Sequence, residues 1–451
     1  MMKKAIITIL GIILPPKEGQ EKAKYYFSED LNEKFSLKKE RYTNMLPLLL
    51  DNFQEYGDIK SIYTNLSKNR QNKVLNYEEL EYNIEKNGQF ISENIDDEEA
   101  NYSYFLDKYN EMIEEYDKVI IDVSHGFRHF PILAVINLII QNIKNPEKIE
   151  YIFFAKEVKQ FKEYEIIDLK EYLELANLSF MLSSFNQNYT VSNNIKFTNP
   201  QYQKIANELV DFSNHFLSNS LKPLIEGKLI ENIIDNLEAL QEEKSVKNFK
   251  GYIVKIIEHL EDIRQLKHES DWKKLYTLSK IMDKRGYQLN AITLLFEAIG
   301  VYCLESLSNI EVIGKRAREY NNYIKTQRKP LHIYSTYTMI NQSRTIVKIR
   351  DRFKVDDKRF FIGTEDLKNI IVDYLGTVDN LNKFIKLIEN LEALRNNLTH
   401  GNTSFTLKDV KKIYIKNLEN FKKFVIDEDI LSGSKDFKEK SNVARLQNKW
   451  Q

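Results

Sequence analysis

The stretch Lys118–Ile140, which reads KVIIDVSHGFRHFPILAVINLII, decides the fold of the first half of this chain. Its opening run, Val119–Ile121, is short, continuous and β-branched, which is typical of a parallel strand buried on both faces. From Pro131 onward the apolar residues follow a helical spacing, and a proline in the first turn of a helix costs little because its N–H would be unbonded there anyway. The stretch therefore predicts a buried strand that leads through a short polar turn into a helix.

The same alternation of strands and helices extends on both sides of this stretch. The predicted strands are Ala5–Leu10, Ile59–Thr64, Lys118–Val123, Ile149–Phe154 and Tyr164–Leu169. The predicted helices are Thr43–Phe53, Glu78–Glu85, Tyr102–Tyr116 and Phe130–Ile143. Strands that alternate with helices favour a parallel sheet, so we expect an α/β, Rossmann-like N-terminal domain of the doubly wound kind.

Beyond this region the composition changes. The segment Ser183–Pro200 is polar and rich in Asn and Ser, which is typical of a linker. Helical spacing dominates after it, and only Arg359–Ile362 alternates like a strand. We therefore expect an α/β domain over residues 1–182, a linker over 183–200, an all-α domain over 201–430 and a flexible tail over 431–451.

The composition limits the classes of function. The chain has 451 residues, with 66 Lys and Arg against 66 Asp and Glu, so its formal net charge is +0. This balance argues against a polybasic protein that grips long nucleic acid, while it leaves room for a small basic site. Only 14 Gly and 8 Pro are present, which excludes collagen-like and low-complexity chains and disfavours turn-dense all-β folds.

The cysteine count and the N-terminus indicate where the protein works. Cys303 is the only cysteine, which excludes an intrachain disulfide and a cysteine-based zinc cluster and is typical of the reducing cytoplasm. The apolar run Ala5–Leu14 is followed by Pro15 and Pro16 instead of a small-residue cleavage site, and it is too short to span a bilayer. We therefore expect a soluble, cytoplasmic protein without a membrane segment.

The polar turn Asp122–Arg128 is the first candidate site. It lies where a strand ends and a helix begins, and helix N-termini present unpaired N–H groups and partial positive charge to anions. We expect Ser124 to cap the helix or donate to a phosphate, Gly126 to allow close backbone approach, and Arg128 to bind phosphate oxygens. The alternative is that Asp122 and Ser124 only end the strand and cap the helix.

Other kinds of chemistry lack their signatures. The sequence has no G-x-x-x-x-G-K-[ST], G-x-G-x-x-G, G-x-S-x-G or H-E-x-x-H, so nucleoside triphosphatases, dinucleotide enzymes, α/β-hydrolases and zincins are not indicated. His125 and His129 are four residues apart, as metal ligands on a helix can be, but no third histidine stands nearby in the sequence. No metal site is expected.

The stretch Arg395–Asn402 is the second candidate site, and it closes a regular apolar stripe. The stripe steps by three and four residues through Leu381, Phe384, Ile388 and Leu391, and position 395 is due next. Arg395 therefore stands where an apolar side chain is expected, and a buried guanidinium without a partner is costly. We expect it to face a carboxylate, a groove or a partner molecule, and an ion pair with Glu392 is the structural alternative.

His400 follows Arg395 by five residues, about 140° around an ideal helix, so one straight helix cannot aim both side chains at one point. Gly401 and Asn402 favour a helix end here, from which His400 could swing back. Arginine and histidine without metal ligands suit RNA cleavage by the substrate's own 2′-hydroxyl. His400 would transfer a proton, Arg395 would hold charge on the phosphate, and Asn396 would orient either partner. One such histidine per chain supplies one acid–base group where the reaction uses two, so this interpretation implies a homodimer.

The two motifs together resemble a known family. The sequence DVSHGFR at Asp122–Arg128 resembles the D-x-T-H-G motif that names a family of CRISPR-associated proteins, with Ser124 in place of the usual threonine. The pattern R-x-x-x-x-H at Arg395 and His400 resembles the ribonuclease motif of HEPN domains. Such proteins carry an N-terminal, Rossmann-like CARF sensor domain followed by a helical HEPN domain, which is also the order of the two predicted domains.

This resemblance implies an ancillary ribonuclease of type III CRISPR defence that a cyclic oligoadenylate switches on. The CARF domains of a homodimer would hold the activator, cyclic tetra-adenylate ahead of cyclic hexa-adenylate. Paired HEPN motifs would cut single-stranded RNA without a metal or cofactor and leave a 2′,3′-cyclic phosphate. The resemblance assigns the effector site to Gly11, Thr64, Ser124, His125, Gly126 and Arg128, and the catalytic site to Arg395, Asn396 and His400.

Two other functions remain open at this point. The chain could be a non-catalytic sensor of cyclic nucleotides whose helical domain is a regulatory module, with Arg395 and His400 structural. A nucleotide-binding transcription regulator is disfavoured, because the sequence has no evident recognition helix and no overall positive charge.

Overall fold

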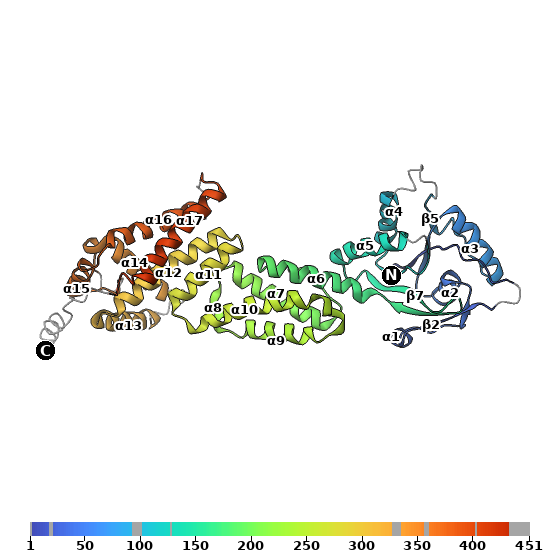
Figure 1. Ribbon diagram of the computed structural model, residues 1–451, viewed down its shortest axis with the longest axis horizontal. Coiled ribbons are helices and arrows are strands. Elements are labelled where there is room, and N and C mark those ends of the chain that lie inside the picture. The colour runs from blue at the N-terminus through green and yellow to red at the C-terminus, as the bar shows by residue number, and fades with distance from the viewer. Residues whose placement is uncertain are drawn as a thin grey trace. The chain divides into compact units, whose positions relative to one another are not determined.

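The computed structural model describes residues 2–17, 21–92, 102–126, 129–326, 335–355, 360–401 and 404–432. By its internal contacts the chain divides into a first unit, Met1–Ser213 with Asn232–Ile257, and a second unit, Asn214–Glu231 with Glu258–Gln451. In Figure 1 the first unit starts at the blue N-terminus, and the second ends in the orange and red helices.

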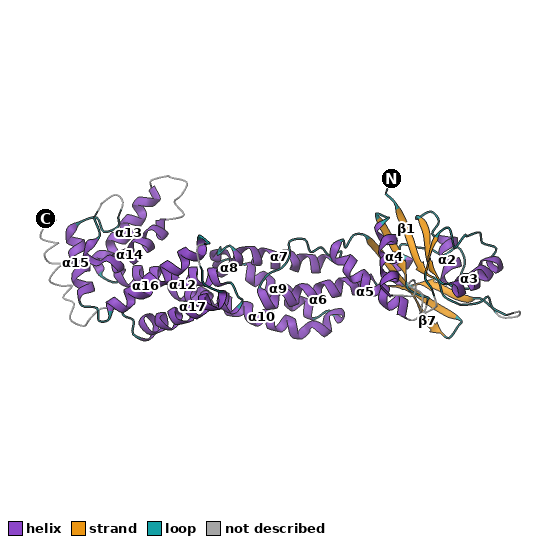
Figure 2. Ribbon diagram, turned by 90° about the horizontal axis from the view of Figure 1, so that it is seen from above, coloured by secondary structure: helices purple, strands orange, loops and turns teal. Residues whose placement is uncertain are grey.

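The first unit is built on one mixed sheet of mostly parallel strands (Figure 2). Its strand order is β3-β2-β8-β7-β6-β1-β4-β5, and only the β2–β3 and β7–β8 pairs are antiparallel. The strands are β1 (Lys4–Ile9), β2 (Ala23–Phe27), β3 (Arg41–Tyr42), β4 (Asp58–Tyr63), β5 (Gly88–Phe90), β6 (Lys118–Asp122), β7 (Ile149–Lys159) and β8 (Glu163–Asp168). The predicted α/β fold class and all five predicted strands are confirmed, while the short strands β2, β3 and β5 were not predicted.

Helices cover both faces of this sheet. The helices of this region are α1 (Glu29–Asn32), α2 (Met45–Asn52), α3 (Asn65–Glu78), α4 (Tyr102–Glu114), α5 (His129–Lys144) and α6 (Lys170–Asn188). Ile6 and Ile120 point to the face under α2 and α3, whereas Ile7 and Ile121 point to the face under α4 and α5. Figure 2 shows the two helix pairs on opposite sides of the orange strands. The burial of successive residues on opposite faces explains why β1 and β6 are continuously apolar.

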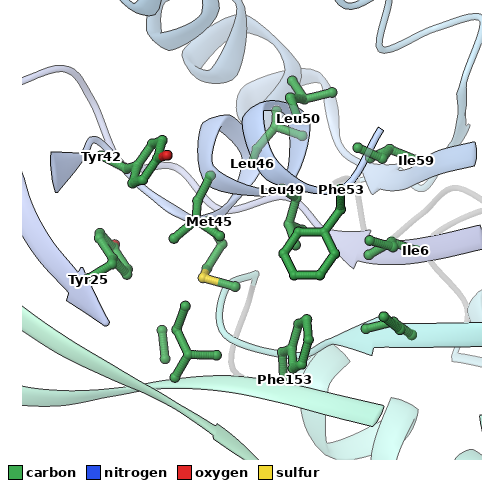
Figure 3. Packing of buried hydrophobic residues seen from close by; sticks show 14 of the residues in the cluster. Ile6, Tyr25, Tyr42, Met45, Leu46, Leu49, Leu50, Phe53, Ile59 and Phe153 are labelled. Atoms are coloured by element: carbon green, nitrogen blue, oxygen red, sulfur yellow. The ribbon is translucent and has the colours of Figure 1, made fainter. Parts of the chain in front are cut away.

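The packing under α2 matters for the site because it fixes where this helix begins. Figure 3 shows Met45, Leu49 and Phe53 lying against Ile6 of β1 and Phe153 of β7, and all five side chains are buried. Burying one such side chain contributes about 1.5–3 kcal/mol to folding. The first turn of α2 is thereby held beside the carboxyl ends of the central strands.

One predicted helix is wrong. The segment predicted at 78–85 is not helical beyond Glu78, where α3 ends, and Glu79 has a left-handed backbone with φ of 56°. The helix lies earlier because Thr64 and Ser67 form a capping box that starts it, although its sequence is mostly polar. The local cap, rather than an apolar stripe, determines this helix.

The segment predicted as a linker belongs to the first unit. Helix α6 continues to Asn188, α7 (Pro200–Leu217) starts at Pro200, and the residues between them are held by side chains. The Val191 N–H donates to Ser213 Oγ at 3.1 Å, and the Glu174 carboxylate accepts from the Thr198 N–H at 2.7 Å. The division of the chain therefore differs from the predicted linker at 183–200. Helices α7, α9 (Leu229–Gln241) and α10 (Lys250–Gln265) contribute residues to both units, and η2 (Lys244–Phe249) precedes α10.

The second unit is all-α in its described residues, as predicted for the C-terminal half. Its further helices are α8 (Leu221–Glu226), η3 (Leu266–His268), α11 (Asp271–Lys284), α12 (Gln288–Ser308), α13 (Glu311–Thr326), α14 (Ser335–Ile349), η5 (Arg350–Arg352), α15 (Glu365–Gly376), α16 (Leu381–Thr399), α17 (Leu407–Phe421) and the π-helical turn η6 (Lys422–Asp427). Helix α12 packs against α11, α13, α14, α16 and α17. By length and composition α12 could cross a membrane, but 72% of its most apolar window is buried among the other helices, as in the core of a bundle.

Two smaller predictions in this unit also fail. Residues 360–362 form no strand, because the Phe361 backbone is bonded by side chains: its N–H donates to Gln342 Oε1 at 2.9 Å and its carbonyl accepts from Arg316 Nε at 3.0 Å. Leu431, the first residue of the predicted tail, is not free of the fold, because it is fully buried and its N–H donates to Tyr302 Oη at 2.8 Å. Residue 359 and the rest of the predicted tail, from 433, lie outside the described residues.

Candidate functional site

The carboxyl ends of β1, β4 and β6 lie side by side in the sheet, and the predicted effector residues follow these ends. Gly11 follows β1, Thr64 follows β4, and Ser124–Gly126 follow β6. A Cβ atom on Gly11 would lie 2.9 Å from the His125 Cβ, so these two segments are in close contact. The fold thus brings together the loops after β1 and β6, at the sheet edge where open α/β folds bind ligands.

A buried hydrogen-bond network fixes the turn after β6. The fully buried Asp122 carboxylate accepts from Thr8 Oγ1 at 2.6 Å, from the Ser124 N–H at 3.0 Å and from Ser124 Oγ at 2.5 Å. Ser124 Oγ in turn accepts from the Ala155 N–H at 2.8 Å. The single hydroxyl hydrogen of Ser124 is thereby used. Ser124 neither caps α5, which begins at His129, nor has a hydrogen left for a phosphate, so it holds the turn in place instead.

Gly126 brings the backbone of this turn against β1. Its φ of +113° is a conformation that side-chain-bearing residues rarely adopt. A Cβ atom there would also lie 2.6 Å from Ile9 Cγ2, which is closer than van der Waals contact allows. Gly126 thus lets the turn pack against β1, while the predicted close approach of its backbone to a ligand stays a prediction.

His125 lies between this turn and the start of α2. The Met45 N–H, at the first residue of α2, donates to His125 Nε2 at 3.4 Å, which makes Nε2 an acceptor. Burial lowers the pKa of His125 below its usual value, and the nearby charge of Asp122 offsets part of this effect. His125 is therefore a neutral imidazole near neutral pH, held at the N-terminus of a helix.

Two polar residues that were not predicted complete this edge. Gln71 of α3 donates from Nε2 to the Gly11 carbonyl at 2.8 Å, and it accepts from Asn44 Nδ2 at 3.1 Å. Asn44 also caps α2 by accepting the Leu46 N–H at 3.0 Å. Asn44 could have been found as a helix cap ahead of an apolar run, whereas nothing in the sequence marks Gln71.

Of the two remaining predicted effector residues, the structure describes Thr64 but not Arg128. The Thr64 side chain is buried and accepts the Ser67 N–H at 3.2 Å as the cap of α3, so its place in the structure is that of a helix cap. Arg128 lies outside the described residues, as does Phe127. Among the described residues no group of three or more His, Cys, Asp and Glu could hold a metal ion.

The second candidate site lies at the C-terminal end of α16. The predicted stripe of Leu381, Phe384, Ile388 and Leu391 is buried, as expected. Arg395 continues the stripe with a side chain 27% exposed, and its Nη1 lies 3.7 Å from Glu297 Oε1 of α12. Its guanidinium carbon lies 4.7 Å from the centre of the Phe296 ring. Arg395 thus faces a carboxylate, which is one of the three surroundings that the sequence predicted for it.

The carboxylate beside Arg395 belongs to Glu297, and not to Glu392 as the structural alternative predicted. Glu392 pairs with Lys348 of α14, with 2.6 Å between Oε2 and Nζ. Glu297 instead stands between Arg395 and Arg344, whose Nη1 lies 3.7 Å from Glu297 Oε2. Burial raises the pKa of Glu297, and the two arginines offset part of the shift.

Asn396 and His400 complete the arrangement. Asn396 Oδ1 accepts from Arg395 Nε at 3.2 Å and from Nη2 at 2.8 Å, so Asn396 orients the arginine. Helix α16 continues to Thr399, His400 ends it with its N–H on the Asn396 carbonyl at 3.0 Å, and Gly401 has φ of +66°. The predicted helix end is therefore confirmed at Gly401, while Asn402 lies outside the described residues.

The His400 ring remains available. The side chain is exposed, and within the described part of the chain no hydrogen bond or ion pair of the His400 ring is present. The predicted swing back toward Arg395 is absent, since the described contacts of Arg395 are with Asn396, Glu297 and Phe296. Arginine and histidine stand on one helix end with the histidine open to solvent.

Comparison with known proteins gives one named relative. No protein-family model matches the chain. The chain is similar to the CRISPR-associated protein MJ1674 of Methanocaldococcus jannaschii, with 24% identity over 341 residues that cover 72% of this chain and 51% of that protein. The chain therefore spans about half the length of this curated relative. The relative is CRISPR-associated, as the resemblance in the two motifs predicted.

The chain also has similarity to solved structures, among them the following one. It is Csm6 of Enterococcus italicus bound to cyclic hexa-2′-fluoro-hexa-dAMP, with 12% identity, coverage of 99% of both chains and a TM-score of 0.32. A TM-score this low does not establish a shared arrangement.

Proposed function

We propose that this chain is a homodimeric ribonuclease of type III CRISPR defence that cuts single-stranded RNA without a metal when a cyclic oligoadenylate binds its α/β unit. The observation that carries the proposal is the end of α16. There Asn396 orients the partly exposed guanidinium of Arg395, and the His400 ring lies open to solvent five residues further on. The CRISPR-associated name of the relative adds support.

The chemistry follows from the residue types. A general base takes the proton of the RNA 2′-hydroxyl, whose oxygen attacks the adjacent phosphorus. The bond from phosphorus to the 5′-oxygen breaks, and a general acid protonates the leaving oxygen, so the products are a 2′,3′-cyclic phosphate and a 5′-hydroxyl. Arg395 stabilises the negative charge that develops on the phosphate oxygens. His400 from each of two copies would serve as acid or base.

A surface suited to a second copy lies on α5. Ile132, Ile136, Ile140 and Ile143 are each at least 50% exposed. Spaced by four, four and three residues, they form one ridge that no charged side chain interrupts. Exposed apolar ridges of this kind mark interaction surfaces, and two identical ridges can pack across a two-fold axis. Because α5 begins three residues after Gly126, such a pairing would place two effector sites near one axis.

The effector site has the features that a phosphate-rich ring needs. The N-terminus of α2 and the turn before α5 meet at His125, and a neutral imidazole can donate or accept hydrogen bonds with a phosphate or base. The tight contact of Gly11 with His125 leaves the backbone of both loops close to any ligand at this edge.

Cleavage of a fluorescent single-stranded RNA in EDTA tests the proposal. The purified protein is assayed with no ligand, with cyclic tetra-adenylate and with cyclic hexa-adenylate, and His400→Ala serves as the control. We expect cleavage that requires a cyclic ligand and His400, with the tetra-adenylate preferred. Equal cleavage by His400→Ala would contradict the catalytic assignment.

The contacts of Arg395 with Glu297 and Asn396 also suit a non-catalytic sensor, in which this arginine is structural. That function predicts measurable binding of a cyclic oligoadenylate without any RNA cleavage. The same assay, combined with calorimetric titration of the ligand, separates the two functions.

A further inference from the structure

Three helices of the second unit converge on one aromatic ring behind Arg395. Phe296 of α12 has the guanidinium carbon of Arg344 at 3.5 Å from its ring centre and that of Arg395 at 4.7 Å. Arg344 comes from α14 and Arg395 from α16. Two like charges thus approach the same ring, and a carboxylate beside them must offset their repulsion.

Arg344 is the anchored member of this group. It is 5% exposed, it donates from Nη1 to the Phe296 carbonyl at 2.9 Å, and it also donates to Asn341 Oδ1. Its Nη1 lies 3.7 Å from Glu297 Oε2. A charge buried this deeply needs its partner, so Arg344 ties the Glu297 carboxylate to one place.

Glu297 therefore has one oxygen beside each arginine. Oε2 lies beside Arg344 and Oε1 lies 3.7 Å from Nη1 of Arg395. Asn396 occupies Nε and Nη2 of Arg395. Since a guanidinium has five N–H donors, these contacts hold Arg395 on two sides and leave donors for a ligand.

The side chains of Arg344, Arg395 and Glu297 together carry an unbalanced positive charge, which lies at the exposed end of the cluster. Two arginines and one glutamate sum to a single positive charge, and the neighbouring Lys348 and Glu392 neutralise each other. Arg344 is buried, so the surplus positive charge is presented by the partly exposed Arg395. One positive charge matches the single negative charge of a phosphodiester.

The position of Glu297 in the sequence also needs an explanation, because a carboxylate is not expected there. It lies inside the most apolar helix of the unit, between the buried residues Phe296 and Ala298. A carboxylate at such a position costs folding free energy unless it is paired. The same burial disfavours the charged carboxylate of Glu297 and so raises its pKa.

We propose that Glu297, held by Arg344, is the positioning residue of the catalytic arginine: it aims the Arg395 guanidinium at the scissile phosphate without touching the RNA. This inference rests on the proposed function for its catalytic consequence. Its structural content, that Glu297 restrains Arg395, stands by itself and has its own readout.

The kinetic test compares Glu297→Gln with Glu392→Gln, which removes an ion pair between α14 and α16 without touching Arg395. Misplacing a catalytic group by about 1 Å can cost about 100-fold in rate. We expect Glu297→Gln to lower kcat by roughly 10- to 100-fold with KM within about threefold, since ground-state binding of the RNA is spread over other contacts. Glu392→Gln should stay within about twofold of the wild type.

The second readout does not depend on activity. Phenylglyoxal, which modifies accessible arginines, is applied to the full-length protein, and peptide mass spectrometry follows Arg395 with the exposed Arg352 as internal reference. We expect Arg395 to react severalfold faster in Glu297→Gln than in the wild type, with Arg352 unchanged, because the carboxylate no longer holds the guanidinium.

Loss of Glu297 alone leaves Arg344 buried without its partner, so a double variant guards against misfolding. Glu297→Met with Arg344→Met removes both charges, and such apolar replacement of a buried pair is often tolerated. It should show the same fall in kcat and the same faster modification of Arg395. Unchanged kcat and unchanged modification in a folded variant would overturn the inference. If the wild type cuts no RNA, the proposed function fails, and the modification rate alone decides whether Glu297 restrains Arg395.

Discussion

The turn after β6 and the end of α16 carry the two motifs of this chain, and they are built in opposite ways. In the turn, Asp122 and Ser124 satisfy each other, and Gly126 adopts a backbone that only glycine tolerates well. At the end of α16, Gly401 has open space around it and the His400 ring is exposed. The described residues of the first region are held by their own hydrogen bonds, whereas the second region presents its groups outward. Under the proposed function, a fixed effector turn and a catalytic end completed by a second copy would fit this contrast.

The largest expected effect is the loss of RNA cleavage when the end of α16 is altered. His400→Ala and Arg395→Ala should each lower RNA cleavage by roughly 10²–10⁴-fold, because each removes either proton transfer or charge stabilisation. His400→Ala should leave the thermal denaturation midpoint unchanged, since the exposed ring makes no described contact. A His400→Ala protein with wild-type cleavage would show that the open end of α16 is not catalytic.

The next effect tests whether the turn is as fixed as its hydrogen bonds indicate. Asp122→Asn replaces one acceptor with a donor that faces Thr8 and Ser124, so the free energy of unfolding should fall by roughly 2–3 kcal/mol. Asp117→Asn, at the exposed residue before the same strand, keeps an amide oxygen that can accept the Lys3 N–H in place of the carboxylate, so it should change the free energy of unfolding by less than about 0.5 kcal/mol. Urea denaturation measures both, and equal losses would contradict the special role of Asp122.

Two glycine substitutions compare the regions directly. Gly126→Ala meets both an unfavourable φ and a contact of 2.6 Å with Ile9, so it should destabilise its unit by roughly 2–3 kcal/mol. Gly401→Ala meets only the unfavourable φ of +66° and should cost about 1 kcal/mol. Hydrogen exchange followed by mass spectrometry reports each region separately. A larger loss of protection around Gly401 than around Gly126 would reverse the contrast.

The smallest effect concerns pH. Because burial lowers the pKa of His125 in the folded state, the unfolded chain binds its proton first as the pH falls. The stabilisation is therefore fully present above about pH 6.5, the usual pKa, and is lost as the pH falls toward the folded value, by at most about 1.4 kcal/mol per pH unit. His125→Gln should remove this part of the pH dependence between pH 7 and 5. Identical pH profiles of unfolding for the two proteins would show that His125 is not held neutral.

The sequence predicts the parts of this molecule whose cause is local. Strands β1 and β6 are continuously apolar because both faces are covered, and the end of α16 is marked by Gly401. Helix α3 was missed because its cap at Thr64 starts a polar sequence, and the strand pairing of β2 depends on β8, far along the chain.

The parts of the site that depend on tertiary packing could not be predicted. Arg395 stood out because it interrupts an apolar stripe, but its partner Glu297 lies on another helix, and only folding brings the two together. The signal that could have found Glu297 is of the same kind, a lone acid inside the apolar helix α12. Gln71 carries no such signal.

Under the proposed function, the open end of α16 cuts RNA through His400. Mass spectrometry of the ends that form on a single-stranded RNA in EDTA with cyclic tetra-adenylate tests it most directly. We expect 2′,3′-cyclic phosphate and 5′-hydroxyl ends with the wild type and intact RNA with His400→Ala. Other ends, or the same ends from both proteins, would contradict it.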